Sequence, residues 1–234
     1  MNKPLTFLLS LTFLFLFSGS VFADDIQDAK DAYNRQDYKE AFRLILPIAK
    51  EGNADAQTKL GDLYYKGQGV PQDYKEAVKW YRLSAEQGYA NAQKDIYDLA
   101  KKNVPEALQF CIKKAKQGDE EAKEILYDLA KKNIPEALQF LVKDAKDGID
   151  EAQNKLGEIY WQGLGLPQSY LDAHMWFNLS GSQGNTDAIR NRNRMERKMS
   201  PEQIVQAQEM AGKWKPKQKS KGLLGQFKEK LGIK

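Results

Sequence analysis

Residues 54–88 read ADAQTKLGDLYYKGQGVPQDYKEAVKWYRLSAEQG, and their pattern predicts the architecture of most of the chain. Apolar residues recur at helical spacing over 56–64 and again over 77–85. Between these two parts, Gly67 and Gly69 favour a turn, and the Val-Pro pair that follows cannot continue a helix. The stretch therefore predicts two helices joined by a turn, which is a helical hairpin.

The second helix of this hairpin has clear start and stop signals. Asp73 is followed three residues later by Glu76, which is the spacing of a capping box at a helix N-terminus. Gly88 suits the C-terminal end, because glycine readily takes the left-handed conformation that ends many helices. We therefore expect the second helix to run between Asp73 and Gly88.

The pair Ala56-Gln57 recurs along the chain at spacings of 36, 30, 30 and 36 residues. Its later forms are Ala92-Gln93, Ala122-Lys123, Ala152-Gln153 and Ala188-Ile189. Self-similarity at such spacings is typical of a solenoid of stacked helix pairs. Solenoids of this kind work mostly as extended binding surfaces, so the repeat favours a binding protein.

The first hairpin resembles the Sel-1-like repeat, a relative of the tetratricopeptide repeat. The residues that carry the resemblance are Ala54, Ala56, Gln57, Leu60, Gly61, Tyr64, Gly67, Gly69, Val70, Asp73, Ala77, Trp80, Tyr81, Ala85 and Gly88. A second match lies in 152–184 and rests on Ala152, Gln153, Leu156, Gly157, Tyr160, Gly163, Gly165, Ala173, Trp176, Phe177 and Gly184. With its weaker repeats, the resemblance covers nearly all of 24–212. It implies an all-α, right-handed solenoid of about six αα-hairpins.

The resemblance also implies a function. Members of the family take part in envelope functions, signalling regulation and host interaction. For this chain the resemblance implies a non-catalytic scaffold or adaptor that holds a protein or peptide, with no cofactor. The alternatives that the sequence leaves open are an enzyme or inhibitor acting on cell-wall polymer and a protein of the membrane surface.

Two shortened repeats occupy the middle of the chain. IYDLAKKNVPEALQF (96–110) and LYDLAKKNIPEALQF (126–140) are nearly identical, and they lack the six residues that correspond to the Gly-x-Gly turn. Each has an asparagine, Asn103 or Asn133, two residues before a proline. This pattern predicts a tighter turn between the two helices.

The shortened repeats also exchange large and small residues in their first helix. Gly61 and Tyr64 of the full repeat are replaced by Tyr97 and Ala100. Residues three apart share a helix face, so one large and one small side chain are kept while their order changes. Dense packing of the repeats would require such compensation.

Residues 1–23 have the pattern of a secretory signal. Lys3 provides the positive start, 5–17 form an apolar run, and small residues lead to a cleavage site after Ala23. The run is shorter than the roughly 20 apolar residues of a membrane-spanning helix, and an uncleaved anchor is the alternative. We therefore expect an exported bacterial protein, periplasmic or secreted.

The tail, residues 213–234, is strongly basic, with eight lysines and one glutamate, whereas 24–212 carries a net charge of about −4. A basic, partly amphipathic segment can lie on an anionic membrane surface. The residues expected to make this contact are Lys213, Lys215, Lys217, Lys219, Lys221, Phe227 and Leu231. Docking in the chain's own acidic groove, docking on a partner and a disordered tail are the alternatives. Nucleic acid is not an expected partner, because the body is acidic and export is expected.

Four carboxylates occupy one register of the repeat, and we call them the acidic row: Asp62, Asp98, Asp128 and Glu158. If the first helices line a concave face, as in tetratricopeptide arrays, these side chains would stack along a groove. Two aromatic residues, Tyr65 and Trp161, follow the first and last of these acids by three residues and would anchor a partner. These six residues are the predicted site for a basic or extended peptide.

A structural explanation of the acidic row is the alternative. Three of its aspartates have a lysine four residues later, namely Lys66, Lys102 and Lys132. Opposite charges at this spacing form favourable pairs on a helix surface. The row would then serve helix solubility rather than binding.

Residues suited to catalysis are few. His174 is the only histidine, so a His/Cys metal cluster is not available and a Ser-His-Asp arrangement would depend on this residue alone. We expect it to be a partly buried packing residue, and we expect Cys111, the only cysteine, to be a small buried hydrophobe. The Gly-x-Gly segments lie between helices and lack a following Lys-Ser/Thr, so they predict turns and not phosphate loops. No catalytic or metal-binding residue is predicted.

Overall fold

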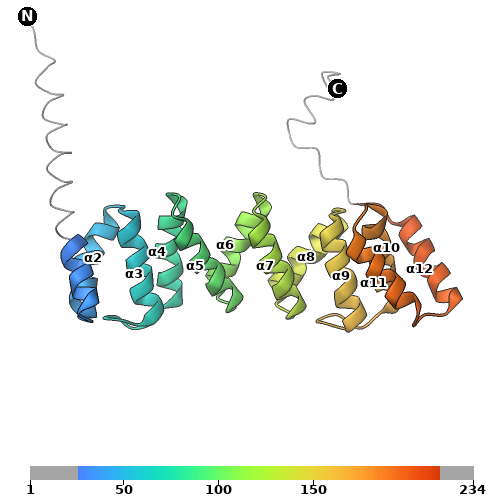
Figure 1. Cartoon of the computed structure of the whole chain (residues 1–234), viewed down its shortest axis with the longest axis horizontal. Helices are drawn as coiled ribbons and strands as arrows, with labels where there is room; N and C mark the ends of the chain where they lie inside the picture. The colour runs from blue at the N-terminus through green and yellow to red at the C-terminus, as the bar shows by residue number, and fades with distance from the viewer. Residues whose placement is uncertain (1–25, 217–234) are drawn as a thin grey trace, which may run out of the picture. The chain divides into compact units, whose positions relative to one another are not determined.

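The computed structural model describes residues 26–216, and every regular element within this range is an α-helix (Figure 1). Residues 26–34 form a first helical stretch. The helices that follow are α2 (Tyr38–Lys50), α3 (Ala54–Lys66), α4 (Tyr74–Glu86), α5 (Ala90–Lys101), α6 (Pro105–Lys116), α7 (Glu120–Lys131), α8 (Pro135–Lys146), α9 (Asp150–Gln162), α10 (Tyr170–Ser182), α11 (Thr186–Glu196) and α12 (Pro201–Lys213). The predicted all-α class is confirmed. The predicted signal over 1–23 lies outside the described residues.

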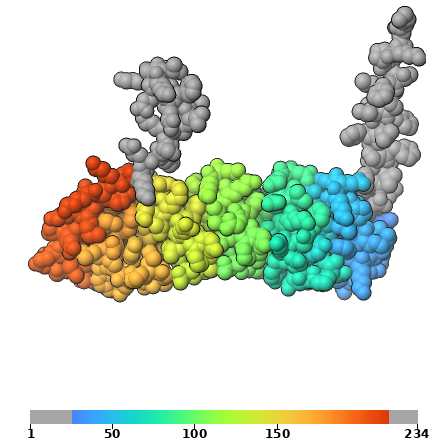
Figure 2. Space-filling model, turned by 180° about the vertical axis from the view of Figure 1, so that it is seen from behind, coloured from blue at the N-terminus to red at the C-terminus, as the bar shows by residue number. Residues whose placement is uncertain are grey.

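The chain forms two compact units, whose boundary falls inside α6 between Phe110 and Cys111. The described part of unit 1 is 26–110, and that of unit 2 is 111–216. In each unit, helices that follow one another in the sequence pack together, as in a repeat solenoid. The packed pairs are α2–α3, α3–α4 and α4–α5 in unit 1, and α7–α8, α8–α9, α9–α10 and α10–α11 in unit 2. In unit 2, α12 also packs against α10, and Figure 2 shows these orange and red segments lying against each other.

The helix ends follow the local signals in the sequence. The side chain of Asp73 accepts hydrogen bonds from the backbone N–H groups of Lys75 and Glu76, at 2.9 and 3.0 Å, which confirms the predicted start of α4. The backbone N–H of Asp73 bonds to the carbonyl of Tyr64, so the reciprocal half of a capping box is not formed there. Gly88 has a φ of +92°, as expected of a residue that ends a helix.

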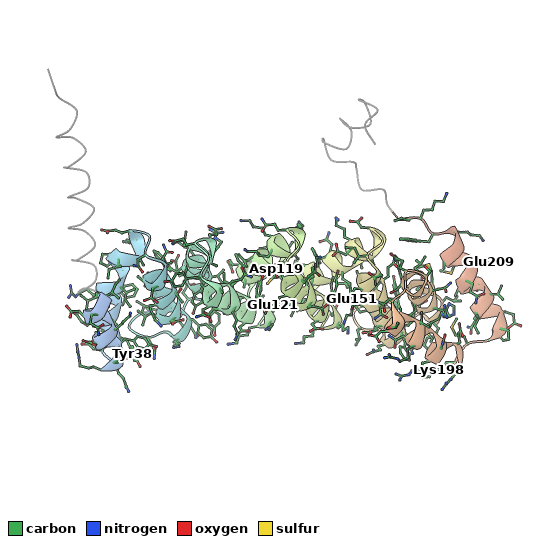
Figure 3. All side chains as sticks on the ribbon, turned by 45° about the horizontal axis from the view of Figure 1, so that its top comes forward. Tyr38, Asp119, Glu121, Glu151, Lys198 and Glu209 are labelled. Atoms are coloured by element: carbon green, nitrogen blue, oxygen red, sulfur yellow. The ribbon has the colours of Figure 1, made fainter. Side chains whose placement is uncertain are left out.

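The second glycine of each Gly-x-Gly turn allows a close approach between neighbouring hairpins. Gly69 has a φ of +77°, and a Cβ atom there would collide with the backbone carbonyl of Tyr38, which is labelled in Figure 3. Gly165 has a φ of +74°, and a Cβ there would collide with the side chain of Asn133. The turn of each full repeat therefore lies directly against the preceding hairpin.

The shortened repeats turn without a glycine pair. Asn103 and Asn133 have φ values of 61° and 60°, in the left-handed region that asparagine tolerates better than most residues. The N–H of Asn103 bonds to the carbonyl of Ala100, and the N–H of Val104 bonds to that of Leu99. The predicted tight turn is confirmed, and it is a helix C-terminal motif with asparagine in the place of glycine.

The glutamine of the recurring Ala-Gln pair joins three successive helices. Gln57 donates to the carbonyl of Ala49 at the end of α2, at 3.1 Å, and accepts from Gln87 after α4, at 2.8 Å. Gln153 makes the same two bonds in unit 2, to Ala145 at 3.1 Å and from Gln183 at 2.8 Å. These bonds satisfy a buried amide and explain why the pair recurs in the full repeats.

The exchange of large and small residues runs between the two helices of a hairpin. A Cβ at Gly61 would lie 2.6 Å from the ring of Tyr81, and a Cβ at Gly157 would lie 2.7 Å from the ring of Phe177. In the hairpin of α7 and α8, the position of this glycine is taken by Tyr127, which is buried. The opposite position is taken by the smaller Leu141, also buried.

This arrangement corrects the predicted compensation within one helix. Tyr64 packs edge-on against Phe42 of the preceding hairpin, with ring centres 5.7 Å apart. It therefore fills a different space from the one above Gly61. Cys111, which stands at the position of Tyr81 and Leu141, is fully buried, as predicted.

Near its start, the basic tail has a residue that packs against α10 of the same unit. The ring of Trp214 meets that of Trp176 edge-on, with centres 5.9 Å apart. Lys213 and Lys215 on either side of it are exposed. The other tail residues of the membrane prediction lie outside the described residues: Lys217, Lys219, Lys221, Phe227 and Leu231. Between residues 26 and 216, no helix combines the length and apolar character needed to cross a bilayer.

Candidate partner-binding site

A pocket of about 240 Å³ lies in unit 1 among α3, α4 and α5. Its lining residues are Asp62, Tyr65, Lys66, Tyr81, Asp95, Asp98 and Leu99. Three of the residues that the sequence predicted, Asp62, Tyr65 and Asp98, therefore meet at one hollow. We call this hollow the unit 1 pocket.

Two carboxylates of the acidic row face the pocket. The hydroxyl of Tyr81 donates to Oδ1 of Asp62 at 2.8 Å, and Lys59 Nζ stands 4.0 Å from its Oδ2. The side chain of Asp98 is 52% exposed and pairs with Lys101 at 3.0 Å. An ion pair as exposed as that of Asp98 with Lys101 contributes little free energy, so an outside cation can compete for the Asp98 carboxylate.

Tyr81 acts here as a neutral hydrogen-bond donor. Burial raises the pKa of Tyr81 far above its ordinary value, and the charge of Asp62 raises it further. The hydroxyl therefore keeps its proton at any physiological pH. Its hydrogen bond orients the Asp62 carboxylate, and both residues line the pocket.

Asp95 is a third carboxylate that the sequence analysis missed. Burial raises the pKa of Asp95 above its ordinary value, and the charges of Asp62 and Asp98 raise it further. Its position three residues before Asp98, on the same helix face, is the signal that could have revealed it. The three carboxylates repel one another in a partly dehydrated hollow, and an entering cation would relieve that repulsion.

Tyr65 lines the pocket and contacts two residues that do not line it, Lys102 and Tyr74. Lys102 Nζ lies 4.7 Å from the centre of the Tyr65 ring and also donates to the hydroxyl of the same residue. The ring of Tyr74, a residue 39% exposed, lies 5.7 Å from that of Tyr65. The Tyr65 ring thus already holds a cation of its own chain, in the geometry of a cation–π contact.

The lysines that follow the acidic row do not pair as predicted. Lys66 donates to the hydroxyl of Tyr33 at 3.0 Å, and Lys102 donates to Tyr65, so each binds a tyrosine of the preceding hairpin. Lys132 has no ion-pair partner in the part of the chain that the structure describes.

Asp62 and Asp98 instead pair within their own helices at three-residue spacing, with Lys59 and Lys101. The structural explanation of the acidic row therefore stays an alternative, with a different spacing from the one predicted.

The other predicted residues lie in unit 2. Glu158 pairs with Lys131 at 2.7 Å and accepts a hydrogen bond from Asn191 at 3.4 Å. Trp161 is half-buried and packs edge-on against Phe177, with ring centres 6.2 Å apart. Asp128 is exposed. Their role in binding stays a prediction, and Glu158 is already neutralised within its own unit.

The structure gives His174 a packing role. It is fully buried on α10, and its Nε2 lies 2.9 Å from Oε1 of Glu196. This contact joins α10 to α11, and neither residue lines the unit 1 pocket. Over residues 26–216, His, Cys, Asp and Glu side chains form no group that could hold a metal ion.

A family model described as Sel1 repeat matches residues 54–89 and 150–185. The chain carries Sel1 repeats. The first Sel1 repeat contains α3 and α4, which supply most of the unit 1 pocket, and the second contains α9 and α10. Proteins with Sel1 repeats are typically protein-interaction scaffolds and are generally non-catalytic.

Two solved structures of Sel1-repeat proteins are similar to this chain. One is a protective antigen present in uropathogenic Escherichia coli strains and displays an SLR fold; it is 30% identical over 75% of this chain, with a TM-score of 0.41. This chain spans only 40% of that protein's length. The other is a Sel1 repeat protein from Oxalobacter formigenes, 29% identical over 74% of this chain and 78% of its own, with a TM-score of 0.36. No match was found among curated protein sequences.

Proposed function

We propose that this chain is a non-catalytic scaffold that binds a protein or peptide partner through the unit 1 pocket. The observation that carries this proposal is the meeting of three carboxylates and two tyrosines with a single lysine, Lys66, in a hollow of about 240 Å³. The general role of Sel1 repeats in binding proteins supports it.

The chemistry of the pocket favours a lysine or arginine side chain of the partner. An ammonium or guanidinium group would form charge-assisted hydrogen bonds with Asp95 and Asp98. It would also lower the raised pKa of Asp95, because an opposite charge favours the ionised carboxylate. The Tyr65 ring offers a cation–π contact at the entrance, where Lys102 now lies.

The proposed setting is the bacterial envelope or the secreted space. The signal pattern of residues 1–23 supports export to the periplasm or beyond. The tail supports an additional contact with an anionic membrane surface, because Trp214 fixes its first residues on unit 2 and leaves Lys213 and Lys215 exposed. Comparing liposome co-sedimentation of the full chain with that of a chain ending at residue 212 tests this contact, which equal sedimentation would exclude.

Peptide binding by the full chain tests the pocket. Peptides on an array that contain lysine or arginine should bind, and matched peptides with acetyl-lysine or citrulline should not. Asp95→Asn with Asp98→Asn should weaken binding about tenfold or more, which corresponds to about 1.4 kcal/mol. Asp128→Asn, an exposed member of the acidic row in unit 2, is the matched control and should bind normally. Equal binding by the pocket variant would overturn the proposal.

A further inference from the structure

Arginine is concentrated in one short segment of this chain. Of seven arginines, four lie between residues 190 and 197, whereas the 29 lysines are spread along the whole sequence. Arginine and lysine carry the same charge, but only the planar guanidinium presents paired donors that match a carboxylate or phosphate. Its concentration in α11 therefore indicates a chemical requirement that positive charge alone does not explain.

Three of these arginines share one face of α11 and its C-terminal cap. Arg190, Arg194 and Arg197 follow one another by four and three residues, and all are exposed. We call them the arginine stripe. Arg194 stands 36 residues after Glu158, in the register of the acidic row, so α11 carries a positive charge where α9 carries a negative one.

The side chains of the arginine stripe make few contacts within unit 2. Arg190 pairs with Asp187 on the same helix at 2.9 Å, and both side chains are largely exposed. The side chains of Arg194 and Arg197 have no hydrogen-bond or ion-pair partner within residues 26–216. The helix dipole favours positive charge at the C-terminal end of α11, where both residues lie, but lysine would meet that need equally well. Folding therefore does not explain why these residues are arginines.

Arg192 provides the contrast within the same helix. Its Nη1 donates to Asn178 at 3.0 Å, and its Nε lies 3.7 Å from Glu196, so it connects α11 to α10. Only 28% of its side chain is exposed. Arg192 thus stabilises the packing of α11 on α10, while the three arginines of the stripe face solvent.

We propose that the arginine stripe is a docking surface for an acidic segment of a partner protein. At about 1.5 Å per residue, the stripe extends roughly 10 Å along α11. Carboxylates on successive turns of a partner helix have nearly the same spacing, so each guanidinium can form a bidentate pair with one carboxylate. This surface lies in unit 2 and does not depend on the unit 1 pocket.

The surroundings of the stripe favour a protein over a lipid surface or a nucleic acid. Asp187 is 64% exposed beside Arg190, and its carboxylate would repel a continuous layer of phosphates, whereas a peptide can place its carboxylates on the other two arginines of the stripe, away from Asp187. Among the described residues of unit 2, the only large apolar side chain that is clearly exposed is Val205 on α12, so a bilayer would gain little apolar contact. Lys198, labelled in Figure 3 at the turn after α11, extends the positive charge at the end of the stripe.

Fluorescence anisotropy with the full chain tests the proposal. The probe is a labelled helical peptide with glutamates at positions i, i+4 and i+7, and its control has glutamines there. The glutamate peptide should bind, and binding should weaken as salt is raised, because these contacts are exposed. Arg194→Glu with Arg197→Glu should weaken it about tenfold or more. Arg194→Lys with Arg197→Lys should weaken it severalfold, because lysine cannot form the bidentate pair.

Arg192→Gln is the matched control for folding. It should lower the melting temperature and leave peptide affinity unchanged, whereas Arg194→Lys with Arg197→Lys, which keeps the positive charge at the end of α11, should leave the melting temperature unchanged. Equal affinity for the glutamate and glutamine peptides, or normal binding by Arg194→Glu with Arg197→Glu, would overturn the proposal. If that variant instead lost binding to anionic phosphatidylglycerol vesicles or to duplex DNA, with peptide binding intact, the stripe would serve that other surface.

Discussion

The two Sel1 repeats share a scaffold and differ in their surface chemistry. In both, a glutamine joins three helices, a helical glycine lies under an aromatic ring, and a second glycine lets the turn touch the preceding hairpin. The ring belongs to Tyr81 in the first repeat and to Phe177 in the second, and the hydroxyl of Tyr81 reaches Asp62. At the position equivalent to Asp62, Glu158 pairs with Lys131 instead. The repeat therefore fixes where a side chain stands, and a few substitutions decide which groups of the chain its carboxylate binds.

Removing the ring above the helical glycine should destabilise either repeat strongly. Tyr81→Ala and Phe177→Ala each leave a cavity and should lower the free energy of unfolding by about 3–5 kcal/mol. Urea denaturation followed by circular dichroism measures this loss. A change below about 1 kcal/mol would show that the ring does not fill the space above Gly61 or Gly157.

The shortened repeats suggest a second substitution that should restore part of the stability lost when the ring at 177 is removed. Combining Phe177→Leu with Gly157→Tyr re-creates the arrangement of Tyr127 and Leu141. The double variant should recover part of the stability that Phe177→Leu loses. Absence of any recovery would contradict an exchange between the two helices of a hairpin.

The turn glycines should show a smaller effect that differs between the repeats. Gly69→Ala forces a shift of the Tyr38 backbone, whereas Gly165→Ala can displace the flexible side chain of Asn133. Both carry the penalty of a left-handed conformation, about 1–2 kcal/mol, and Gly69→Ala should cost more because of the backbone collision. Gly88→Ala is the control, since nothing lies within 4 Å of its added Cβ. Equal losses at all three glycines in thermal unfolding would mean that the turn does not press on the preceding hairpin.

Tyr81→Phe keeps the aromatic ring of the first repeat and removes its hydroxyl, as in the second repeat, where Phe177 stands at this position. It removes the donor to Asp62 and should lower the free energy of unfolding by about 1 kcal/mol. Urea denaturation of this variant beside Tyr81→Ala separates the hydroxyl from the ring. Equal losses in the two variants would show that the hydroxyl, and not the packing, accounts for the effect.

The pH dependence of stability should reveal the crowding of carboxylates in unit 1. The pKa of Asp95 is raised in the folded chain, so the folded state binds its proton more tightly than the unfolded state. The protonated Asp95 therefore stabilises the folded state fully below the pKa of the unfolded chain, about 3.9, and this stabilisation is lost as pH rises through the higher pKa of the folded chain. Asp95→Asn should therefore raise the melting temperature slightly at pH 7 but not at pH 3. The same change at both pH values would contradict this assignment.

Much of the fold could be predicted from the sequence because its signals are local. Helical periodicity and the Gly-x-Gly segments located the hairpins, and Asp73 and Gly88 marked the ends of α4. At the start of α12, Ser200 and Gln203 form both halves of a capping box, which is a local signal of the same kind. Asn103 indicated the tight turn, since asparagine tolerates the left-handed conformation.

The candidate site could be predicted only in part, because it depends on contacts between helices. The register brought Asp62 and Asp98 together, but Tyr81 comes from another helix and Asp95 lies outside the repeated pattern. The lysine spacing predicted ion pairs within one helix. In the structure, Lys66 and Lys102 each donate a hydrogen bond to a tyrosine of the preceding hairpin instead. The sequence also predicted the wrong partner for the helical glycine. The aromatic ring that fills the space above it belongs to the other helix of the hairpin.

The pKa of Asp95, measured with and without a bound peptide, would test the unit 1 pocket at the atoms involved. Carboxyl-carbon NMR titration of the full chain, with Asp95→Asn to assign the signal, gives this value directly. Saturation with a lysine- or arginine-containing peptide should lower the raised pKa of Asp95 towards its ordinary value, because the bound cation stabilises the ionised carboxylate. A peptide that binds while the pKa of Asp95 stays unchanged would contradict a partner cation in this pocket.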